Sequence, residues 1–565
     1  MVYTVFYKTS SFAGYCFLNK NSIHPKRRDV FNFKHFEVTL VKFQICSFIV
    51  DKTKMISYVN STLGTKEKLT CVSRPRRFGK SFTAQMLCAY YDKSCDSREL
   101  FQGLEIAQTE EFLQYLNKFN VIYLDVTWFI STVEKIEDTV KYLQREVVRE
   151  LRDAFPDMTG EERSLPIALS DISDAADSRF IIIIDEWDAL FRETRDQIEL
   201  QKEYLQLLRG LFKSSLTDKM IEAAYMTGIL PIKKYGTQSA LTDFQEYTMI
   251  QPKFLAEYVG FTEKEVRSLC QEYKLDFDEA KKWYDGYSFS RVHSVYSPNS
   301  IMQAVKNGEF GDYWTETETY ESLKYYIDMN LDGLQESIVS MLGGMRYRIN
   351  TRTFQNDMLS IKSRDDVLTL LIHLGYLAYD SEEKEVYIPN QEVADEFKNA
   401  VEYSGWAGIS DALRASERLL KATLECDAKT VASELDKAHM ENASILTYND
   451  ENALSCVITI AYYAAKSDYT LIREFPTGKG FADIVFLPRR KVNKPALLVE
   501  LKWNQSAAGA LAQLKNREYT GALRDYTGQL LLVGINYDKS RKKHECIIEK
   551  YATVQSCGTI PAKSI

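Results

Sequence analysis

Histidine, paired cysteines and long apolar runs are scarce or missing in this sequence of 565 residues, and each shortage excludes a class of protein. Only six histidines occur, and none are spaced like metal ligands, so a zinc site built on histidine is not expected. The ten cysteines include no C-x-x-C pair, and several, such as Cys71, Cys88 and Cys456, lie in apolar segments. We therefore predict the reduced, buried cysteines of a cytoplasmic protein rather than disulfides or zinc ligands.

Membrane and secretion signals are also missing. No apolar run approaches the roughly 18 residues that a membrane span needs, so no membrane partner is expected. The first residues lack the basic segment, apolar stretch and cleavage site of a secretory signal. The net charge of −8 argues against a surface that binds nucleic acid over its whole extent, although a local basic groove is compatible with it. A chain of this length exceeds one core, and about three or four domains are expected.

The sequence does contain a phosphate-binding loop of unusual form at residues 74–81 (RPRRFGKS). The usual pattern is G-x-x-x-x-G-K-[S/T], in which backbone N–H groups surround phosphates while the lysine and the hydroxyl reach phosphate and Mg²⁺. Arg74 stands at the first glycine position. An apolar strand at 69–73 and an apolar helix at 82–91 would place the loop at a helix N-terminus, which binds anions; the alternative is a basic surface turn. The predicted nucleotide-binding residues are Arg76, Arg77, Phe78, Gly79, Lys80 and Ser81, with Ser81 also a ligand of Mg²⁺.

A second signal follows at residues 180–184 (FIIII), an apolar and mostly β-branched run that ends in Asp185 and Glu186. Such a run is typical of a central parallel strand buried on both faces. A carboxylate at its C-terminal end projects into the crevice where α/β folds bind ligands. We therefore predict that Asp185 holds Mg²⁺, directly or through water, and that Glu186 polarises the attacking water. The alternative is a buried strand followed by an acidic turn.

A third group of residues, near the C-terminus, indicates different chemistry. The segment 478–488 has Asp483 at the start of an alternating apolar strand, and a second strand at 495–503 carries Glu500 and Lys502 on one side. If the two strands pair as a hairpin, Asp483 and Glu500 converge on one divalent cation, and two carboxylates with waters suit Mg²⁺. Lys502 would then position the attacking water or stabilise the transition state at a phosphodiester. The alternative is a surface hairpin whose charges face solvent.

Two helices beside this hairpin supply further candidates. A helix over residues 506–519 carries Gln513 at a spacing that could face the site, so Gln513 is a candidate catalytic residue. Upstream, Glu451 precedes an apolar helix at 453–465. Glu451 is either a third carboxylate ligand of the metal or an acidic residue that the helix dipole favours.

Taken in order, these motifs resemble two known families. The chain from residue 46 onward resembles the AAA-ATPase-like family of prokaryotic proteins, in which an arginine at the first glycine position is normal. Its C-terminal part resembles the PD-(D/E)xK nuclease superfamily. Trp187 replaces a commoner tyrosine, the segment 239–244 departs from the family pattern, and residues 1–45 do not match it. The matching segments are 48–53, 74–81, 184–188, 227–230 and 282–287 for the first family and Gly480, Asp483, 500–502, Gln513, Tyr519 and 533–537 for the second.

The expected architecture is α/β and multidomain. It comprises a divergent arm at 1–45, a P-loop NTPase domain with a parallel sheet at 46–255, a mainly helical region at 256–405 and a restriction-endonuclease-like α/β domain at 406–565. Thr227, near the end of a further strand, is predicted to sense the γ-phosphate through its hydroxyl. A buried threonine bonded to the backbone is an equally good interpretation.

Three functions are compatible with these patterns. The resemblance implies ATP and Mg²⁺ as cofactors and an ATP-driven or ATP-gated nuclease that acts on DNA or RNA. The second function is a nucleotide-controlled module that binds nucleic acid or protein without cutting. The third is an NTPase that acts on protein partners. Because Asp483, Glu500 and Lys502 are all intact, the first is favoured, with nucleic acid as the predicted partner and assembly into a homo-oligomer left open.

Overall fold

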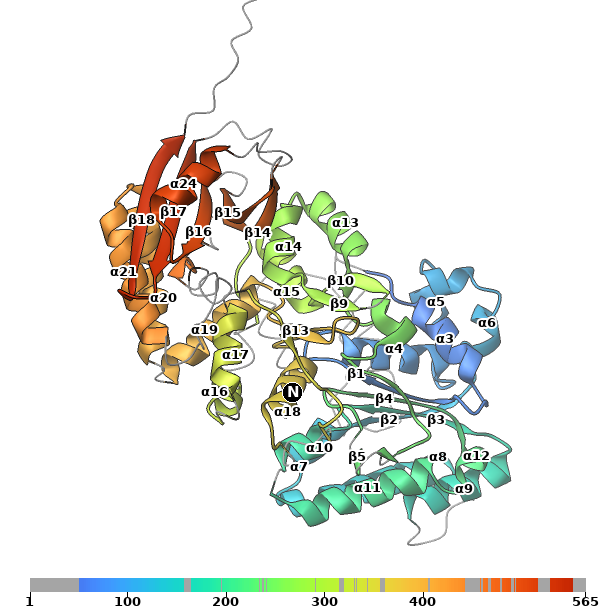
Figure 1. Ribbon diagram of the computed structural model, residues 1–565. Helices are drawn as coiled ribbons and strands as arrows, with labels where there is room; N and C mark the ends of the chain where they lie inside the picture. The colour runs from blue at the N-terminus through green and yellow to red at the C-terminus, as the bar shows by residue number, and fades with distance from the viewer. Residues whose placement is uncertain are drawn as a thin grey trace, which may run out of the picture. The chain divides into compact units, whose positions relative to one another are not determined.

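Two units make up the chain in the computed structural model (Figure 1). The first unit consists of Met1–Glu316 and Arg348–Val393, and the second of Thr317–Tyr347 and Ala394–Ile565. The structure describes residues 50–551 except for 157–163, 195, 233, 236–237, 240, 290, 315–319, 330, 332, 343, 356–360, 405–406, 443–457, 459–460, 466–468, 478–479, 489–491, 493 and 517–528.

The four-part division expected from the sequence stays a prediction, because a division into two units does not test its boundaries. Within the described ranges, no helix is both long and apolar enough to cross a membrane.

A five-stranded parallel sheet forms the centre of the first unit, in the order β2-β3-β4-β1-β7. β1 and β3 are buried along their whole length, as expected for apolar strands covered on both faces. The strands β1 and β3 precede the two N-terminal motifs and lie on either side of β4, so both motifs emerge at the same edge of the sheet. The strands are β1 (Leu69–Ser73), β2 (Asn120–Asp125), β3 (Phe180–Asp185), β4 (Ile221–Gly228) and β7 (Gln245–Tyr247).

Helices cover both faces of this sheet (Figure 1). On one face, α4 contacts β2, β3 and β4. On the other face, α8, α9 and α11 contribute Leu143, Leu169 and Leu208 to the core that also contains the isoleucines of β3. This arrangement confirms the predicted α/β fold of the nucleotide-binding type. The helices are α3 (Lys54–Thr62), α4 (Lys80–Tyr91), α7 (Val126–Thr132), α8 (Thr139–Ala154), α9 (Leu165–Ala176), α10 (Ala189–Glu193) and α11 (Ile198–Phe212).

The rest of the first unit is built from helices and short antiparallel strands. The sequence caps these helices clearly: Thr262 and Glu265 form a capping box for α13, and Gly375, with φ +90°, ends α18. The strands β9 and β10 pair with each other, as do β12 and β13, and β12 lies against β9. The elements are β8 (Phe261–Thr262), α13 (Glu263–Tyr273), α14 (Phe277–Tyr284), β9 (Tyr287–Phe289), β10 (Val292–Tyr296), α15 (Pro298–Asn307), α18 (Arg364–Leu374), β12 (Ala378–Asp380) and β13 (Glu385–Tyr387).

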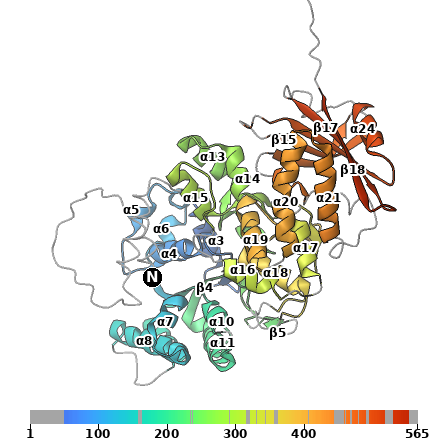
Figure 2. The same cartoon turned by 90° about the vertical axis from the view of Figure 1, so that its left-hand side faces the viewer.

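The second unit contains a five-stranded mixed sheet in the order β14-β15-β16-β17-β18. Only β16 and β17 pair in parallel among these neighbours. The helices α20 and α21 cover one face, as Figure 2 shows, and α24 packs on β16 and β17 from the other. This mixed sheet agrees with the predicted nuclease-like α/β domain. The elements are α20 (Ala407–Leu424), α21 (Ala428–Asn442), β14 (Tyr469–Thr477), β15 (Gly480–Pro488), β16 (Ala496–Trp503), α24 (Ala507–Asn516), β17 (Leu530–Asp538) and β18 (Lys543–Tyr551).

Candidate functional site

The phosphate-binding loop joins β1 to α4, and its backbone twice adopts the left-handed conformation. Arg77 has φ +68°, and Gly79, the N-cap of α4, has φ +88°. Glycine adopts this conformation without steric cost, whereas a residue with a Cβ atom, such as Arg77, carries a cost of about 1–2 kcal/mol. The loop places Lys80 in the first turn of α4, where its side chain is buried. The predicted order of strand, loop and helix is therefore present.

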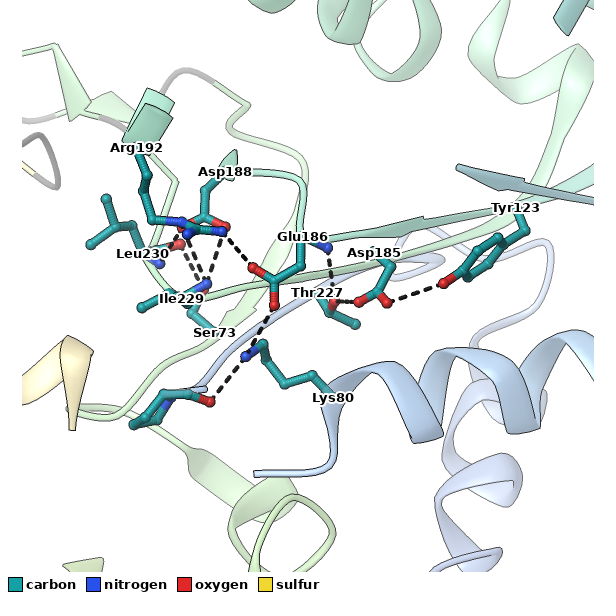
Figure 3. A network of polar contacts seen from close by, with 11 residues as sticks. Ser73, Lys80, Tyr123, Asp185, Glu186, Asp188, Arg192, Thr227, Ile229 and Leu230 are labelled. Atoms are coloured by element: carbon teal, nitrogen blue, oxygen red, sulfur yellow. Dashed lines mark hydrogen bonds and ion pairs between the residues drawn. The ribbon is translucent and has the colours of Figure 1, made fainter. Parts of the chain in front are cut away.

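The Lys80 ammonium group lies between the phosphate-binding loop and the acidic end of β3 (Figure 3). Its Nζ donates a hydrogen bond of 2.9 Å to the carbonyl oxygen of Pro75 and lies 3.4 Å from Oε1 of Glu186. The two N-terminal motifs, far apart in the sequence, therefore meet at the C-terminal edge of the sheet.

Asp185 is buried at the end of β3 and has a partner for each carboxylate oxygen (Figure 3). The Tyr123 hydroxyl donates to Oδ2 at 3.1 Å, and the Thr227 hydroxyl donates to Oδ1. Burial and the neighbouring charge of Glu186 raise the pKa of the Asp185 carboxyl, while Thr227, Ser81 and Lys80 act in the opposite direction. Ser81 and Asp185, the two predicted metal ligands of this site, are therefore close enough to interact.

Glu186 follows Asp185 with φ +53°, which turns its side chain away from the strand direction and toward two cations. Its carboxylate forms ion pairs with Lys80 and with the Arg192 guanidinium. Burial alone would raise the pKa of the Glu186 carboxyl, but the charges of Lys80, Arg192 and Arg76 together lower it. Glu186 is thus held as a carboxylate at the edge of the candidate site.

Asp188 connects this acidic segment to the end of β4. Its buried carboxylate accepts hydrogen bonds from the backbone N–H groups of Ile229 and Leu230 and pairs with Arg192 at 3.0 Å. A Cβ atom on Gly228 would lie 2.6 Å from the Trp187 ring and 2.7 Å from Oδ1 of Asp188, so only glycine fits there. The segments 185–188 and 227–230 are therefore held together by hydrogen bonds and close packing.

Thr227 has a defined role in this structure. The side chain is completely buried, and its hydroxyl accepts a hydrogen bond from the Glu186 N–H at 3.2 Å while donating to Asp185. Its predicted contact with the γ-phosphate stays a prediction. The contacts present here are to the acidic segment, so Thr227 orients Asp185 and the backbone of Glu186.

Sequence reasoning missed three residues of this site. Tyr123 and Asp125 end β2, which pairs with β3 in parallel register so that Asp125 lies opposite Asp185. Burial and the charge of Asp185 raise the pKa of Asp125 to about 6. Arg192 lies four residues after Asp188 in α10, and this helical spacing could have identified the pair from the sequence. The contacts between β2 and β3 could not be predicted, because the sequence does not give the order of the strands in the sheet.

The arginines and Phe78 of the loop divide into buried and accessible groups. Arg74, at the first glycine position, is completely buried; its Nη1 donates to the carbonyl oxygens of Ser73 (3.0 Å) and Tyr247 (3.2 Å). Burial lowers the pKa of Arg74 to about 10. Phe78 is also buried, so its predicted contribution to nucleotide binding is limited to its backbone. Arg76 is exposed and Arg77 half-buried, so the side chains of both are accessible.

The second unit brings Asp483, Glu500 and Lys502 together on neighbouring strands. β15 and β16 are antiparallel with Ile484 opposite Val499, which places Asp483 opposite Glu500 on one face of the sheet. Oδ2 of Asp483 accepts a hydrogen bond of 2.7 Å from the Leu501 N–H. Lys502 Nζ lies 3.2 Å from Oε1 of Glu500, which is buried. The hairpin predicted from the sequence is therefore present.

α24, which carries the predicted residue Gln513, packs on the face of the sheet that bears these three side chains. Leu511 and Leu514 of α24 share a core with Leu498, which is two residues before Glu500. Gly534, paired with Glu500 in β17, permits this close packing, because a Cβ atom there would lie 2.5 Å from the Ala507 carbonyl oxygen. Gln513 is half-buried.

The expected third metal ligand, Glu451, lies outside the residues that the structure describes. In the described part of the chain, no group of three or more histidine, cysteine, aspartate or glutamate side chains is arranged to hold a metal ion. Among the described residues, the candidate metal donors at the second site are the Asp483 and Glu500 carboxylates, and two carboxylates suit a hard cation that keeps several waters.

Comparison with known protein families matches two parts of the chain, one in each unit. Residues 44–237 match the family described as predicted AAA-ATPase, and residues 449–546 match the PD-(D/E)XK nuclease superfamily. The chain is therefore an AAA-ATPase-like protein with a C-terminal PD-(D/E)XK nuclease superfamily domain. This finding confirms the family resemblance that the sequence motifs indicated.

Similarity to solved structures is weak, and no curated protein matches the chain. The Aeropyrum pernix ORC2 protein in its ADPNP-ADP complexes is 10% identical, with 68% of this chain and 97% of that chain covered and a TM-score of 0.27. A structure described as a DNA replication initiation factor is 12% identical, with 73% and 88% covered and a TM-score of 0.23. Similarity at this level carries no information about the function of this chain.

Proposed function

We propose that the protein is an ATP-binding P-loop NTPase that hydrolyses ATP and is joined to a Mg²⁺-dependent nuclease acting on DNA or RNA. The observation that carries this proposal is the meeting of Lys80, Asp185 and Glu186 at one edge of a parallel sheet. The matching families imply the use of a nucleotide and of a divalent metal ion in general. ATP, Mg²⁺ and hydrolysis are the specific parts of the proposal.

In the first unit, backbone N–H groups of the loop and the Lys80 ammonium group would bind the phosphates. Ser81 and Asp185 fit a Mg²⁺ ion, since a hydroxyl and a carboxylate lie together beside the phosphate-binding loop. A bound Mg²⁺ would neutralise charge that develops on the phosphates. Glu186, kept ionised by its cationic neighbours, would orient and polarise the attacking water.

In the second unit, Asp483 and Glu500 would hold a divalent cation on the face of the sheet on which α24 packs. Such a cation stabilises negative charge at a scissile phosphate and lowers the pKa of a bound water. Lys502, which approaches Glu500 from two residues along β16, would orient that water or stabilise the transition state. Gln513 is proposed to contact the substrate from α24.

A paired assay on the purified full chain tests this proposal. ATP binding and hydrolysis, and cleavage of DNA and RNA with Mg²⁺ or Mn²⁺, are measured for wild type, Lys80→Ala and Asp483→Asn. Lys80→Ala is expected to weaken ATP binding by about tenfold or more, because a charge-assisted contact to phosphate is lost. Asp483→Asn is expected to abolish cleavage while ATP hydrolysis is retained.

Two surface variants serve as matched controls. Lys202→Ala removes an exposed lysine of α11, and Glu545→Gln removes an exposed carboxylate of β18. Both should leave the two activities unchanged. ATP binding by Lys80→Ala equal to that of wild type would contradict the nucleotide site, and cleavage that persists in Asp483→Asn would contradict the nuclease site.

The alternative, a nucleotide-controlled module that binds without cutting, has one observation in its favour. Asp483 and Glu500 are already engaged by the Leu501 N–H and by Lys502, so both carboxylates are stabilised within the protein. A wild-type protein that binds nucleic acid with ATP-dependent affinity, yet cuts neither DNA nor RNA with either metal, would favour this function.

A further inference from the structure

The residues that anchor the phosphate-binding loop come from the region that follows the parallel sheet. Pro75 and Phe78 are both buried, and they flank the accessible residues Arg76 and Arg77. The ring of Phe78 packs edge-on against the ring of Tyr287, with centroids 5.3 Å apart. A Cβ atom on Gly375 would lie 2.7 Å from Cβ of Pro75, so the end of α18 is in close contact with the other side of the loop.

Tyr287 connects these two anchors. Its ring contacts Phe78, and its hydroxyl donates a hydrogen bond of 2.6 Å to the carbonyl oxygen of Gly375, which itself contacts Pro75. The Tyr287 side chain is buried, so these contacts are made in the absence of competing water. One side chain of β9 therefore contacts Phe78 directly and is linked to Pro75 through Gly375.

The sequence around Tyr287 also fixes its own position. Gly286 has φ +119°, and a Cβ atom there would lie 2.0 Å from the carbonyl oxygen of Pro389, so another residue cannot be accommodated. The Tyr387 hydroxyl donates to the Gly286 carbonyl oxygen at 2.9 Å, and Asp285 accepts a hydrogen bond from Ser294. These contacts give a physical reason for the pattern Asp285-Gly286-Tyr287.

The position of Pro75 matters for the chemistry of the loop. The carbonyl oxygen of Pro75 accepts the hydrogen bond from Lys80 Nζ, so a shift of Pro75 changes the position of the phosphate-binding ammonium group. Arg77 has φ +68°, and a strained backbone persists only where its surroundings determine it from several sides. Anchors on both sides of Arg77 meet this requirement.

We propose that Tyr287 is a positioning residue of the nucleotide site: it holds Pro75 and Phe78 so that Lys80, Arg76 and Arg77 are arranged to bind the phosphates of the nucleotide. This proposal rests on the proposed binding of ATP and extends it to residues 286–389, which the match to the AAA-ATPase family does not cover. The nucleotide site is then complete only with β9 and the end of α18 in place.

Two conservative substitutions separate positioning from general stability. Tyr287→Phe removes the hydroxyl and its hydrogen bond to Gly375 and keeps the ring against Phe78. Tyr284→Phe is its matched control: the Tyr284 hydroxyl donates to the Gly311 carbonyl oxygen at 2.9 Å and accepts from the Gly311 N–H at 3.1 Å, so its described hydrogen bonds are to Gly311 and not to the phosphate-binding loop. Tyr287→Leu removes the ring as well and should have the larger effect.

The measurement is the Kd for ATP with Mg²⁺, taken on the full chain at a temperature where thermal melting shows each variant to be folded. Tyr287→Phe is expected to raise the Kd about two- to tenfold, the equivalent of one buried hydrogen bond, and Tyr284→Phe to leave it unchanged. Both variants are expected to lower the melting temperature, Tyr284→Phe at least as much as Tyr287→Phe, because the Tyr284 hydroxyl both donates to and accepts from the backbone of Gly311. When Gly375→Ala is combined with Tyr287→Phe, the Kd for ATP should rise by less than the product of the two separate fold-changes, because both substitutions act on Pro75.

The outcomes distinguish this inference from the function on which it rests. If wild type binds ATP and Tyr287→Phe binds it equally well, the positioning role is wrong while the proposed function stands. An equal loss of affinity in Tyr284→Phe would show that Tyr287 acts only through stability, which also overturns the inference. If wild type and Lys80→Ala fail alike to bind ATP, the nucleotide site itself is wrong and the inference falls with it.

Discussion

The two candidate sites of this protein use the same residue types but are built over different distances in the sequence. In the first unit, the carboxylates at the end of β3 are held by side chains from β2, β4, α4 and α10. In the second unit, Asp483 is held by the backbone of the adjacent strand and Glu500 by Lys502 of its own strand.

This difference teaches how stability and function are connected in each unit. A site assembled from many elements is stabilised by contacts that also stabilise the fold, so its residues cannot be exchanged without affecting the whole unit. At a site whose described contacts lie within one hairpin, the side chains contribute less to the stability of the sheet that carries them. We therefore expect substitutions in the first site to cost stability and those in the second to cost mainly activity.

The largest expected difference is between two nearly inaccessible carboxylates, Asp188 and Glu500. Asp188→Ala leaves Arg192 with Glu186 as its remaining carboxylate partner and two buried backbone N–H groups without an acceptor. It should destabilise the first unit by about 3–5 kcal/mol, with loss of ATP binding. Glu500→Gln keeps the shape of the side chain, and Lys502 can turn toward water, so a change within about 1 kcal/mol is expected. Calorimetric unfolding of both variants measures this contrast; equal losses would break the comparison.

A smaller loss of stability is expected when alanine replaces Gly228 or Gly534, one glycine in each unit, and the two losses should be similar. Gly228→Ala would press on the Trp187 ring, and Gly534→Ala would press on the backbone of α24 at Ala507 and Leu511. Overpacking of this kind costs about 1–3 kcal/mol. Gly103→Ala, where no atom lies within 4 Å of the new Cβ, is the control and should be neutral.

Only the functional consequences of these two glycine variants should differ. Gly228→Ala displaces Asp188 and should weaken ATP hydrolysis, whereas Gly534→Ala displaces α24 beside Glu500 and should affect cleavage alone. Thermal melting with both activity assays measures the result. A Gly534→Ala variant that lost ATP hydrolysis would contradict the independence of the two sites.

The smallest expected effect is the dependence of stability on pH, which should have opposite signs in the two units. The pKa of Asp125 is raised to about 6 by burial and by Asp185, so the folded first unit loses stability as pH rises from the unfolded value near 4 through 6. Asp125→Asn, which keeps a capping side chain for α7, should therefore stabilise this unit by about 1–2 kcal/mol at pH 8 and have no such effect at pH 4.

In the second unit, burial and the charge of His544 lower the pKa of His439 to about 4. The folded second unit keeps this imidazole neutral, so its contribution to stability is fully present above the ordinary pKa of histidine, near 6.5, and is lost as pH falls toward 4. Unfolding measured at several pH values for wild type and Asp125→Asn should show the two opposite trends. An increase in stability of Asp125→Asn that persisted unchanged at pH 4 would contradict the cause given for it.

Much of both sites could be predicted because their residues lie next to strong local signals. The apolar run 180–184 indicated the strand that ends in Asp185, and the alternation in 480–488 and 495–503 indicated the hairpin that pairs Asp483 with Glu500. The contacts of Tyr123 with Asp185 and of Tyr287 with Phe78 were not predictable in this way. They depend on which strands and loops become neighbours, and a sequence pattern of short period contains no information about that order.

The buried Arg74 illustrates the same limit. Arg74 stands at the first glycine position of the motif, and its side chain donates to the carbonyl oxygen of Tyr247 in β7 and lies 5.5 Å from the ring of Phe289. Tyr247 and Phe289 lie far from Arg74 in the sequence, so only the folded chain shows these contacts. They indicate that the Arg74 side chain holds the loop in place and does not itself bind the nucleotide.

The amino-acid sequence by itself determined the class of the protein, the order of its two domains and the residues at the centre of each site, since loops, strands and helices follow from local patterns of glycine, charge and hydrophobicity. The tertiary structure alone decided how those residues are held. Asp185 and Glu186 receive their partners from β2, β4, α4 and α10, and Pro75 and Phe78 are anchored by Tyr287 and Gly375. The physical reason is that hydrogen bonds, ion pairs and ring contacts depend on distance in space, which the chain sets only once its strands and helices have packed.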